Sequence, residues 1–342
     1  MIYGVIMAGG RGERFWPLSR KAYPKQFLAL TSDRPLIIET RDRLEGFIDK
    51  ENIFVVTTDE LKDEIVKMGF RQDKLIVEPE GKNTLYAVLL SAIHIIRDDP
   101  EAVIYTLPSD HYVGDNQEFA TVLKKGMKVA EMNGLGTFGI KPTRPETGYG
   151  YIEQGERIED GIYRVKRFTE KPNQKLAVEF LKKGGFLWNS GIFVWKAEKI
   201  IEEVKTHQPH LTGAIEGLLK DYTDKNIKNL YDAGEPISVD YGVMERSKDV
   251  YTVLADFPWD DIGTWAALGR ILPSDENGNT IKGDVVALNT TGSILYAENG
   301  TILAEGLSNY IVVHTEDATL VIPKNRSQEL KNFLKGLKEK YL

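Results

Sequence analysis

The sequence predicts an α/β protein with a mixed, mostly parallel sheet, and two observations support this. Apolar runs of strand length, such as 2–7, 53–57 and 102–107, alternate with amphipathic stretches through about the first 270 residues. Continuous apolar strands separated by helices are typical of a parallel sheet with both faces covered. From residue 277 onward, short strands follow one another at roughly eight- to ten-residue spacing, which indicates a small β-domain of meander or β-helix type.

The elements of the first half follow a regular order. Helices are predicted over 36–47, 60–68 and 84–97, with a short strand over 75–77. Ligands of open α/β sheets bind beyond the carboxyl ends of the strands. We therefore expect the chemistry in the segments that follow Met7 and Leu107.

A turn at Asn277-Gly278-Asn279 suggests the domain boundary. Residues 1–275 are predicted to form the α/β domain and residues 281–342 the small β-domain. The latter ends in an amphipathic, Lys-rich helix from Ser327 to Leu342, with Ser327 as its N-cap.

The composition excludes several classes of protein. The chain has 342 residues, a net charge of -7 and no cysteine. Disulfides, thiolate catalysis and cysteine zinc sites are therefore excluded, and a reducing cytoplasm is the expected location. An acidic chain argues against nucleic-acid and membrane-surface partners. The longest apolar stretch, 87–96, is too short to span a bilayer.

A glycine-rich segment follows the first strand. It contains Ala8, Gly9, Gly10, Gly12 and Arg14. Glycines at this place let backbone N–H groups converge on an anion, although a sharp strand-to-helix turn would need them too. The segment lacks the Gly-Lys-Ser/Thr of a P-loop and the third glycine of a dinucleotide fingerprint.

These residues belong to a set of motifs that resembles the sugar-1-phosphate nucleotidyltransferases. The nucleotide-binding signature is Gly9-Gly10-x-Gly12-x-Arg14 with Pro24-Lys25-Gln26-Phe27-Leu28, and its Gln-Phe-Leu ending resembles the mannose-1-phosphate guanylyltransferase (GDP-mannose pyrophosphorylase) branch. Further motifs follow in family order over about 260 residues. They are Glu78-Pro79-x-Gly81-Lys82-Asn83-Thr84, Leu107-Pro108-Ser109-Asp110-His111, Gly148-Tyr149-Gly150-Tyr151-Ile152, Glu170-Lys171-Pro172, Trp188-Asn189-Ser190-Gly191-Ile192-Phe193, Ser238-Val239-Asp240-Tyr241-Gly242-Val243-Met244-Glu245 and Trp259-Asp260-Asp261-Ile262-Gly263-Thr264-Trp265.

The resemblance implies a Rossmann-like nucleotidyltransferase domain with a left-handed β-helix-like domain after it. It also implies an activity, the transfer of GMP from GTP to α-D-mannose 1-phosphate to give GDP-mannose and pyrophosphate. The sugar phosphate would attack the nucleotide α-phosphorus in line, with Mg²⁺ as the cofactor, and a homodimer is the expected assembly.

The resemblance also implies the site residues. The nucleotide would bind at Ala8, Gly9, Gly10, Gly12, Arg14, Lys25, Lys82, Asn83, Ser109 and Asp110. The sugar phosphate would bind at Gly150, Glu170, Lys171, Asn189, Asp240 and Tyr241. The catalytic set would be Arg14, Lys25, Asp110, Lys171 and Asp261. Mg²⁺ would bind Asp110 and Asp261, with the adjacent Asp260 as the alternative ligand.

Other interpretations stay open at this point. Asp110 could cap a turn, the Asp260-Asp261 pair could cap a helix, and Thr84 could simply help a helix to start. The chain could use another nucleotide and sugar 1-phosphate, against which the Gln-Phe-Leu motif argues. It could also be a non-catalytic nucleotide-sugar sensor, although all five charged catalytic positions are present.

Overall fold

The computed structural model describes residues 1–10 and 12–337, which form two compact units. Unit 1 consists of residues 1–9, 40–109 and 113–259, and unit 2 of residues 10–39, 110–112 and the chain from 260 onward. Both units are thus discontinuous in sequence, and the glycine-rich segment is shared between them. Within the described residues, no helix combines the length and apolar character needed to cross a bilayer.

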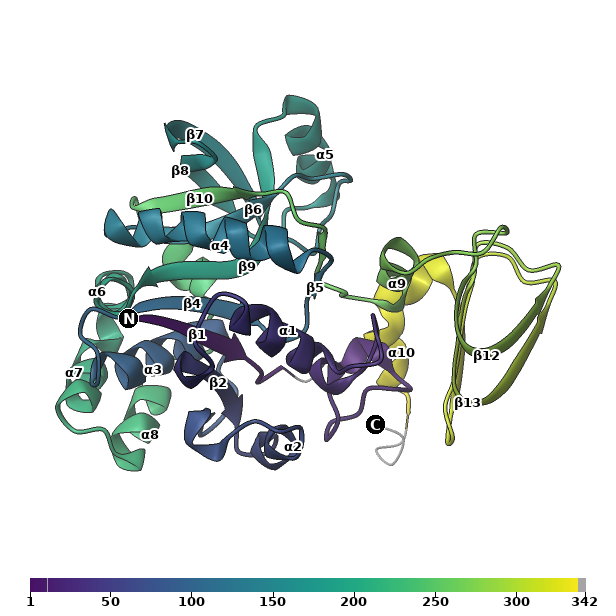
Figure 1. Cartoon of the computed structure of the whole chain (residues 1–342), viewed down its shortest axis with the longest axis horizontal. Coiled ribbons are helices and arrows are strands. Elements are labelled where there is room, and N and C mark those ends of the chain that lie inside the picture. Colours follow the sequence, from purple (N-terminus) through teal and green to yellow (C-terminus); the bar gives the residue numbers. More distant parts are fainter. Residues whose placement is uncertain (11, 338–342) are drawn as a thin grey trace. The chain divides into compact units, whose positions relative to one another are not determined.

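Unit 1 is built on a nine-stranded mixed sheet with the order β3-β2-β1-β4-β9-β6-β10-β8-β7 (Figure 1). Its strands are β1 Ile2–Met7, β2 Ile53–Thr58, β3 Leu75–Glu78, β4 Val103–Pro108, β6 Leu135–Ile140, β7 Tyr151–Glu159, β8 Ile162–Thr169, β9 Phe186–Lys196 and β10 Val250–Ala255. Pairing is parallel from β3 to β4 and between β6 and β10, and antiparallel wherever β9, β8 or β7 joins. The predicted mixed sheet is confirmed.

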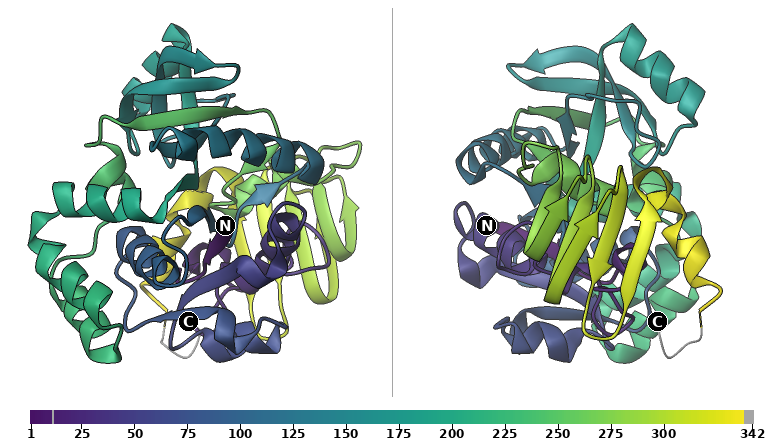
Figure 2. Two further views of the ribbon diagram at one scale, coloured as in Figure 1. Left: turned by 60° about the vertical axis from the view of Figure 1, so that its left-hand side comes forward. Right: turned by 90° about the vertical axis from the view of Figure 1, so that its right-hand side faces the viewer.

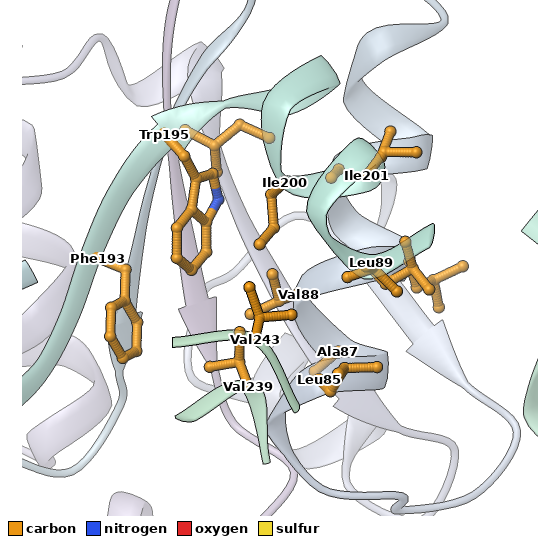
Figure 3. Close-up of a cluster of buried hydrophobic side chains, with 14 of the residues drawn as sticks. Leu85, Ala87, Val88, Leu89, Phe193, Trp195, Ile200, Ile201, Val239 and Val243 are labelled. Carbon is orange, nitrogen blue, oxygen red and sulfur yellow. The ribbon is translucent and has the colours of Figure 1, made fainter. Parts of the chain in front are cut away.

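Helices cover both faces of this sheet. On one face, α3 (Thr84–Ile96) packs against α6 (Ala197–His207), and Leu89, Ile200 and Trp195 belong to the buried cluster there (Figure 3). On the other face, α4 (Asn116–Glu131) contacts β6, β9 and β10, and the Tyr105 hydroxyl donates to the Leu123 carbonyl at 2.7 Å. The uninterrupted apolar strands in the sequence reflect this burial on both sides.

The remaining helices agree with the sequence where it made a prediction. The predicted helices correspond to α1 (Leu36–Glu45), α2 (Lys62–Lys67) and α3, with ends within two residues or so. Four other elements are α5 Gln174–Lys183, α7 Thr212–Lys220, α8 Asp224–Asp232 and a π-helical turn at Asp240–Met244. The chain passes between the units within two short paired strands, β5 (Tyr112–Val113) and β11 (Trp259–Asp260).

Unit 2 contains a four-stranded sheet, β12-β13-β14-β15 (Figure 2). Its strands are β12 Thr280–Leu288, β13 Ile294–Glu305, β14 Tyr310–His314 and β15 Thr319–Pro323. The first three are parallel without intervening helices, and the bond from Tyr310 N to the Ser293 hydroxyl spans 17 residues. Parallel strands stacked at such a short repeat form a β-helix-like domain, as predicted.

The end of unit 2 differs from the predicted helix. A 3₁₀ segment begins at Lys324, directly after Pro323, and contains Ser327, so Ser327 is not the N-cap. Proline ends the strand and fixes a backbone angle that suits the start of a helix, which explains the earlier beginning. The helix α10 covers Leu330–Leu334, and the part of the prediction beyond residue 337 lies outside the described residues.

The core of unit 2 joins the signature segment to the C-terminal strands. Trp265, at the start of α9 (Trp265–Ile271), is fully buried, and its ring lies 5.0 Å from Phe15 and 5.5 Å from Tyr296. Its indole N–H donates to the Trp16 carbonyl at 3.0 Å. The β-domain therefore helps to position the loop that carries the predicted phosphate-binding residues.

Candidate active site

A polar cavity of about 450 Å³ lies within unit 2, and the predicted phosphate- and metal-binding residues surround it. Its lining consists of Gly12, Arg14, Phe15, Lys25, Asp110, His111, Asp261, Gly263 and Lys331. These residues come from four separate stretches of sequence. The structure therefore brings together Gly12, Arg14, Lys25, Asp110 and Asp261, five of the residues expected to serve catalysis and the nucleotide.

Gly12 is held against Lys25 in a conformation that favours glycine. Its φ is +54°, and a Cβ at this position would lie 2.4 Å from the Lys25 backbone nitrogen. Gln26 adds a second restraint, because its side-chain amide donates to the Gly10 carbonyl at 3.0 Å. The glycines of the signature segment are therefore in direct contact with Lys25 and Gln26, and Gln26 holds the glycine-rich loop in place.

Lys25 connects the two aspartates that line the cavity. Only 5% of Lys25 is exposed, and its Nζ lies 2.9 Å from Asp110 Oδ2 and 2.5 Å from the Asp261 carbonyl oxygen. Burial works to raise the pKa of Asp110, but the charge of Lys25, the neighbouring His111 and the hydrogen bonds to the carboxylate together outweigh it and hold that pKa below its ordinary value. Asp110 is therefore an ionised carboxylate beside a buried cation.

The structure separates the roles of Asp260 and Asp261. Asp260 is 4% exposed, accepts from Ile262 N at 2.9 Å and pairs with Arg270 at 3.0 and 2.7 Å. Asp261 accepts from Gly263 N at 2.9 Å and lines the cavity, whereas Asp260 does not. Neither aspartate caps a helix, because α9 begins at Trp265 with Thr264 as its N-cap; both instead accept from the backbone N–H two residues on, and Asp261 is the one that lines the cavity.

The donor set of this cavity fits a magnesium ion. Mg²⁺ is usually held by one or two protein carboxylates, with phosphate oxygens and waters completing six ligands. Asp110 and Asp261 supply two carboxylates, and the described residues contain no cluster of three or more His, Asp and Glu suited to a metal. Two carboxylates leave most of the six ligand positions to phosphate oxygens and waters, so this arrangement suits a cation that arrives with a phosphate substrate.

Two cationic groups complete the cavity. Arg14 Nη1 donates weakly to the Gly263 carbonyl at 3.4 Å, which places the guanidinium on the same wall as Asp261. Lys331 comes from α10, which sequence reasoning treated as a solvated helix. No signal in the sequence marked Lys331, because only folding brings α10 next to the signature loop.

Unit 1 holds the residues predicted to bind the sugar phosphate. Glu170 Oε1 accepts from the Lys171 ammonium, while Glu170 Oε2 is buried and has no hydrogen-bond partner among the described residues. A Cβ on Gly150 would lie 2.5 Å from that same oxygen. Gly150 therefore leaves room beside an acceptor, as a hydroxyl-binding site requires. The backbone N–H of Glu170 donates to a Glu245 carboxylate oxygen at 2.8 Å, a positioning contact that sequence reasoning missed, although Glu245 is the last residue of the motif that begins at Ser238.

Asn189 and Asp240 extend this group. Asn189 Nδ2 donates to Asp240 Oδ1 at 2.9 Å, and the Thr137 hydroxyl donates to Asn189 Oδ1 at 2.8 Å, which fixes the amide orientation. Burial, followed by the nearby charge of Glu170, raises the pKa of Asp240 to about 7. Burial works to lower the pKa of Lys171, but Glu170 raises it overall, so Lys171 is charged. Tyr241 is exposed beside them.

A buried glutamate begins the motif that contains the predicted nucleotide residues Lys82 and Asn83. Glu78 is 3% exposed, and its Oε1 accepts from the Tyr231 hydroxyl at 2.7 Å. Its Oε2 would lie 3.1 Å from a Cβ on Gly9, so this carboxyl group adjoins the end of β1. Burial raises the pKa of Glu78 to about 7. Sequence reasoning quoted the Glu78 motif but assigned this residue no role.

The other predicted nucleotide residues of unit 1 have structural contacts of their own. Asn83 is the N-cap of α3, and its side chain accepts from Thr84 N at 2.8 Å. The backbone φ of Asn83 is +69°. The Thr84 hydroxyl accepts from Val239 N at 3.0 Å. The Lys82 ammonium donates to the Tyr231 carbonyl. Ser109 is buried. The backbone N–H of Ala8 donates to the Val56 carbonyl, and the Ala8 carbonyl accepts from the Thr57 hydroxyl. Their nucleotide contacts stay predictions.

Comparison with known proteins identifies the family. The family model described as nucleotidyl transferase matches residues 3–278, and the model of the mannose-phosphate isomerase/GMP-like β-helix domain matches residues 283–337. The chain belongs to the nucleotidyl transferase family. The mannose-1-phosphate guanylyltransferase of Escherichia coli K12 is 36% identical over 98% of this chain and 73% of its own length.

Two further relatives agree with this membership. The alginate biosynthesis protein AlgA of Pseudomonas aeruginosa is 34% identical over 97% of this chain and 71% of its own length. A Thermus thermophilus crystal structure of a mannose-1-phosphate geranyltransferase is 37% identical, covers 98% of both chains and has a TM-score of 0.92. The fold and the sugar-1-phosphate nucleotidyltransferase character of the chain follow from these likenesses.

Proposed function

We propose that this enzyme transfers GMP from GTP to α-D-mannose 1-phosphate, giving GDP-mannose and pyrophosphate with Mg²⁺ as the cofactor. The observation that carries the proposal is Lys25, a buried cation that contacts Asp110 and Asp261 beside Gly12. Relatives at 34–38% identity that are named mannose-1-phosphate guanylyltransferase support the choice of nucleotide and sugar.

The cavity of unit 2 would bind the triphosphate. Backbone N–H groups of Gly10 and Gly12, together with Arg14 and Lys25, would neutralise phosphate oxygens. Asp110 and Asp261 would hold Mg²⁺, which when bound supplies positive charge for the phosphates and the leaving pyrophosphate. Positioning and charge neutralisation suffice for this reaction, because the attacking phosphate oxygen is already ionised and no proton must be removed.

The group around Glu170 would bind the sugar phosphate. Lys171 would pair with the phosphate and orient its attacking oxygen, since a charged ammonium is a good point-charge partner for phosphate. The buried Glu170 Oε2, Asn189 and Asp240 offer acceptors for sugar hydroxyls beside Gly150. Tyr241 would line the exposed side of the same group.

Glu78 would account for the choice of guanine. A carboxylate offers two acceptor oxygens to the adjacent N1–H and N2–H₂ donors of guanine, and no other standard base presents two donors in that arrangement. The pKa of Glu78, about 7 in this structure, would fall when the N–H donors of guanine bind, because hydrogen bonds to a carboxylate favour its ionised form. Uracil, thymine and adenine would leave a buried carboxylate unsatisfied, which is a strong basis for rejection.

Pyrophosphate release over a panel of nucleoside triphosphates and sugar 1-phosphates tests the proposal. We expect GTP with mannose 1-phosphate to be the best pair by kcat/KM, and Mg²⁺ to be required. Lys25→Ala should lose activity, while Lys62→Ala, at a half-exposed lysine that pairs with Asp59 on the surface, should retain it. A different preferred pair would support the alternative substrate specificity, and GTP binding without turnover would support a sensor.

We also propose a homodimer in the cytoplasm. Exposed apolar side chains on the β-domain, including Val286, Leu288, Leu303 and Val321, support an interface there. The absence of cysteine suits a reducing compartment. Light scattering of the purified protein tests the dimer, and a monomer at micromolar concentration would contradict it.

A further inference from the structure

The backbone of Lys171 adopts a conformation that a lysine before a proline rarely has. Its φ is +44°, which lies in the left-handed region that favours glycine. Pro172 adds to the strain, because a proline ring pushes the residue before it toward an extended backbone. Strain of this kind persists only where surrounding contacts impose it, and it is common at functional sites. Contacts within unit 1 must therefore hold Lys171 in this conformation.

The left-handed backbone determines where the Lys171 ammonium lies. Strand β8 ends at Thr169, and the side chains of successive residues in an extended chain point in opposite directions. The turn at Lys171 breaks this alternation, so its ammonium donates to Oε1 of the preceding Glu170. Burial works to lower the pKa of Lys171, but the charge and hydrogen bond of Glu170, followed by the charge of Asp240, raise it. An extended Lys171 would carry its ammonium away from both carboxylates.

A carboxylate from another segment fixes the peptide group that leads into Lys171. Glu245 Oε1 accepts from the backbone N–H of Glu170 at 2.8 Å. Pro172, on the other side of Lys171, is buried. A hydrogen bond to a charged acceptor is comparable in strength to the strain of one left-handed residue, so this bond can determine the conformation. We propose that Glu245 is a positioning residue of the sugar-phosphate site, which keeps the Lys171 ammonium beside Glu170. The binding role of that ammonium rests on the proposed function.

Glu245 is fixed in turn by the core of unit 1. It directly follows the π-helical turn Asp240–Met244, and its backbone N–H donates to the Asp240 carbonyl at 2.9 Å. Val243 of this turn is fully buried in the cluster that contains Leu85 of α3 (Figure 3). π-Helical turns are rare and are found frequently at functional sites. The Glu245 side chain, although exposed, therefore extends from a backbone that is anchored in the core.

Both ends of the π-helical turn contact residues of the sugar-phosphate site. At its start, Asp240 Oδ1 accepts from the Asn189 amide at 2.9 Å, and after its end Glu245 accepts from Glu170 N–H. Asn189 belongs to β9, whereas Glu170 directly follows β8. One element thus contacts residues that two strands supply. Because Glu245 makes the second of these contacts, its loss should displace Lys171 and leave the contact between Asn189 and Asp240 in place.

Nitrogen-15 NMR of the lysine ammonium groups tests the positioning without any substrate. Lys171→Ala identifies the Lys171 resonance in the full chain. Glu245→Met removes the acceptor at similar side-chain length, and we expect the resonance to move to the range of lysines that lack an ion pair. Glu245→Gln keeps an acceptor oxygen and should leave the resonance near its wild-type position. A wild-type position in Glu245→Met, or the same movement in both variants, would overturn the proposal.

Phosphorus-31 NMR titration with α-D-mannose 1-phosphate measures the effect on binding. We expect Glu245→Met to weaken binding at least about ten-fold and Glu245→Gln at most about three-fold, because the first loses the hydrogen bond and the second keeps a neutral one. Glu179→Met, at an exposed glutamate of α5, is the matched control and should bind like the wild type. An unchanged affinity in Glu245→Met, or an equal loss in the control, would count against the positioning role.

A double-variant cycle separates positioning from structural damage. In the Lys171→Ala background, Glu245→Met should weaken binding by less than about two-fold, since the ammonium that Glu245 positions is already absent. A loss as large as that in the wild-type background would show that Glu245 acts elsewhere. Initial rates supply a second check, because Glu245→Met should raise the KM for the sugar phosphate far more than the KM for GTP. Equal rises in both would overturn the assignment.

The proposed function can fail separately from this inference. Absence of mannose 1-phosphate binding by the wild type would contradict the function, while movement of the Lys171 resonance in Glu245→Met would still establish the positioning role. Binding of the sugar phosphate together with an unmoved resonance would leave the function standing and overturn the positioning.

Discussion

The ammonium of Lys25 lies 2.9 Å from Asp110 Oδ2 although only 7% of the lysine side chain is exposed to solvent. A buried ion pair of this kind contributes little net stability, because desolvation of both charges offsets their attraction. Its value is positional, since it fixes a cation and a carboxylate at one point of the cavity wall before any substrate arrives.

Replacement of Lys25 should therefore affect the reaction more than the fold. We expect Lys25→Ala to lower kcat by on the order of 10² or more, because one contact to developing charge is lost. Lys25→Arg should not restore it, since the wider guanidinium cannot take the place of a buried ammonium held 2.9 Å from Asp110 Oδ2 and 2.5 Å from the Asp261 carbonyl oxygen. Steady-state rates near those of the wild type for Lys25→Ala would contradict the assignment.

Gly12→Ala should destabilise the signature loop. The positive φ and the 2.4 Å approach to Lys25 leave no space for a Cβ, and such strain costs about 1–3 kcal/mol. Chemical denaturation measures the loss, and kcat should fall with it because Lys25 is displaced.

Gly217→Ala, in α7, is the matched control. Nothing lies within 4 Å of a Cβ there, so this variant should be neutral or more stable by up to about 1 kcal/mol. Equal stabilities of Gly12→Ala and the wild type would show that the loop adapts.

The sequence predicted much of this site because its information is local. Continuous apolar strands revealed the sheet, and the signature motifs named the residues from Gly12 to Asp261 that line one cavity. The sequence favoured Asp261 over Asp260 but left Asp260 as an alternative, because the ion pair that occupies Asp260 depends on Arg270, which is ten residues away and carries no motif. Lys331 and Glu78 were missed for a similar reason: their surroundings are made by α10 and by Tyr231, which only folding brings near.

Asp260 and Asp261 should respond differently to substitution. Asp260→Asn breaks a buried pair with Arg270, so we expect a loss of about 2 kcal/mol in the free energy of unfolding and an unchanged Mg²⁺ requirement. Asp261→Asn should leave stability within about 0.5 kcal/mol and raise the Mg²⁺ concentration needed for half-maximal rate. The reverse pattern, measured by denaturation and by Mg²⁺ titration of the rate, would assign the metal to Asp260.

Glu78 should couple stability to pH with a sign opposite to that of most acidic groups. Its pKa is raised to about 7 in the folded protein, so the folded state holds a proton that the unfolded chain releases near pH 4.5. Its stabilising contribution is present at low pH and is lost as the pH rises through about 7. At pH 8.5, Glu78→Gln should therefore be more stable than the wild type by roughly 2–3 kcal/mol.

The same substitution should weaken binding of the nucleotide. The glutamine side chain offers one acceptor oxygen, whereas the two donors of guanine need two. Glu78→Gln should therefore raise the KM for GTP by at least about ten-fold. It should also lower the ratio of kcat/KM for GTP to that for the other nucleoside triphosphates. Glu60→Gln, at an exposed position, is the control and should change neither quantity. A variant with higher stability and wild-type KM would show that burial alone accounts for Glu78, and that guanine is selected by other residues.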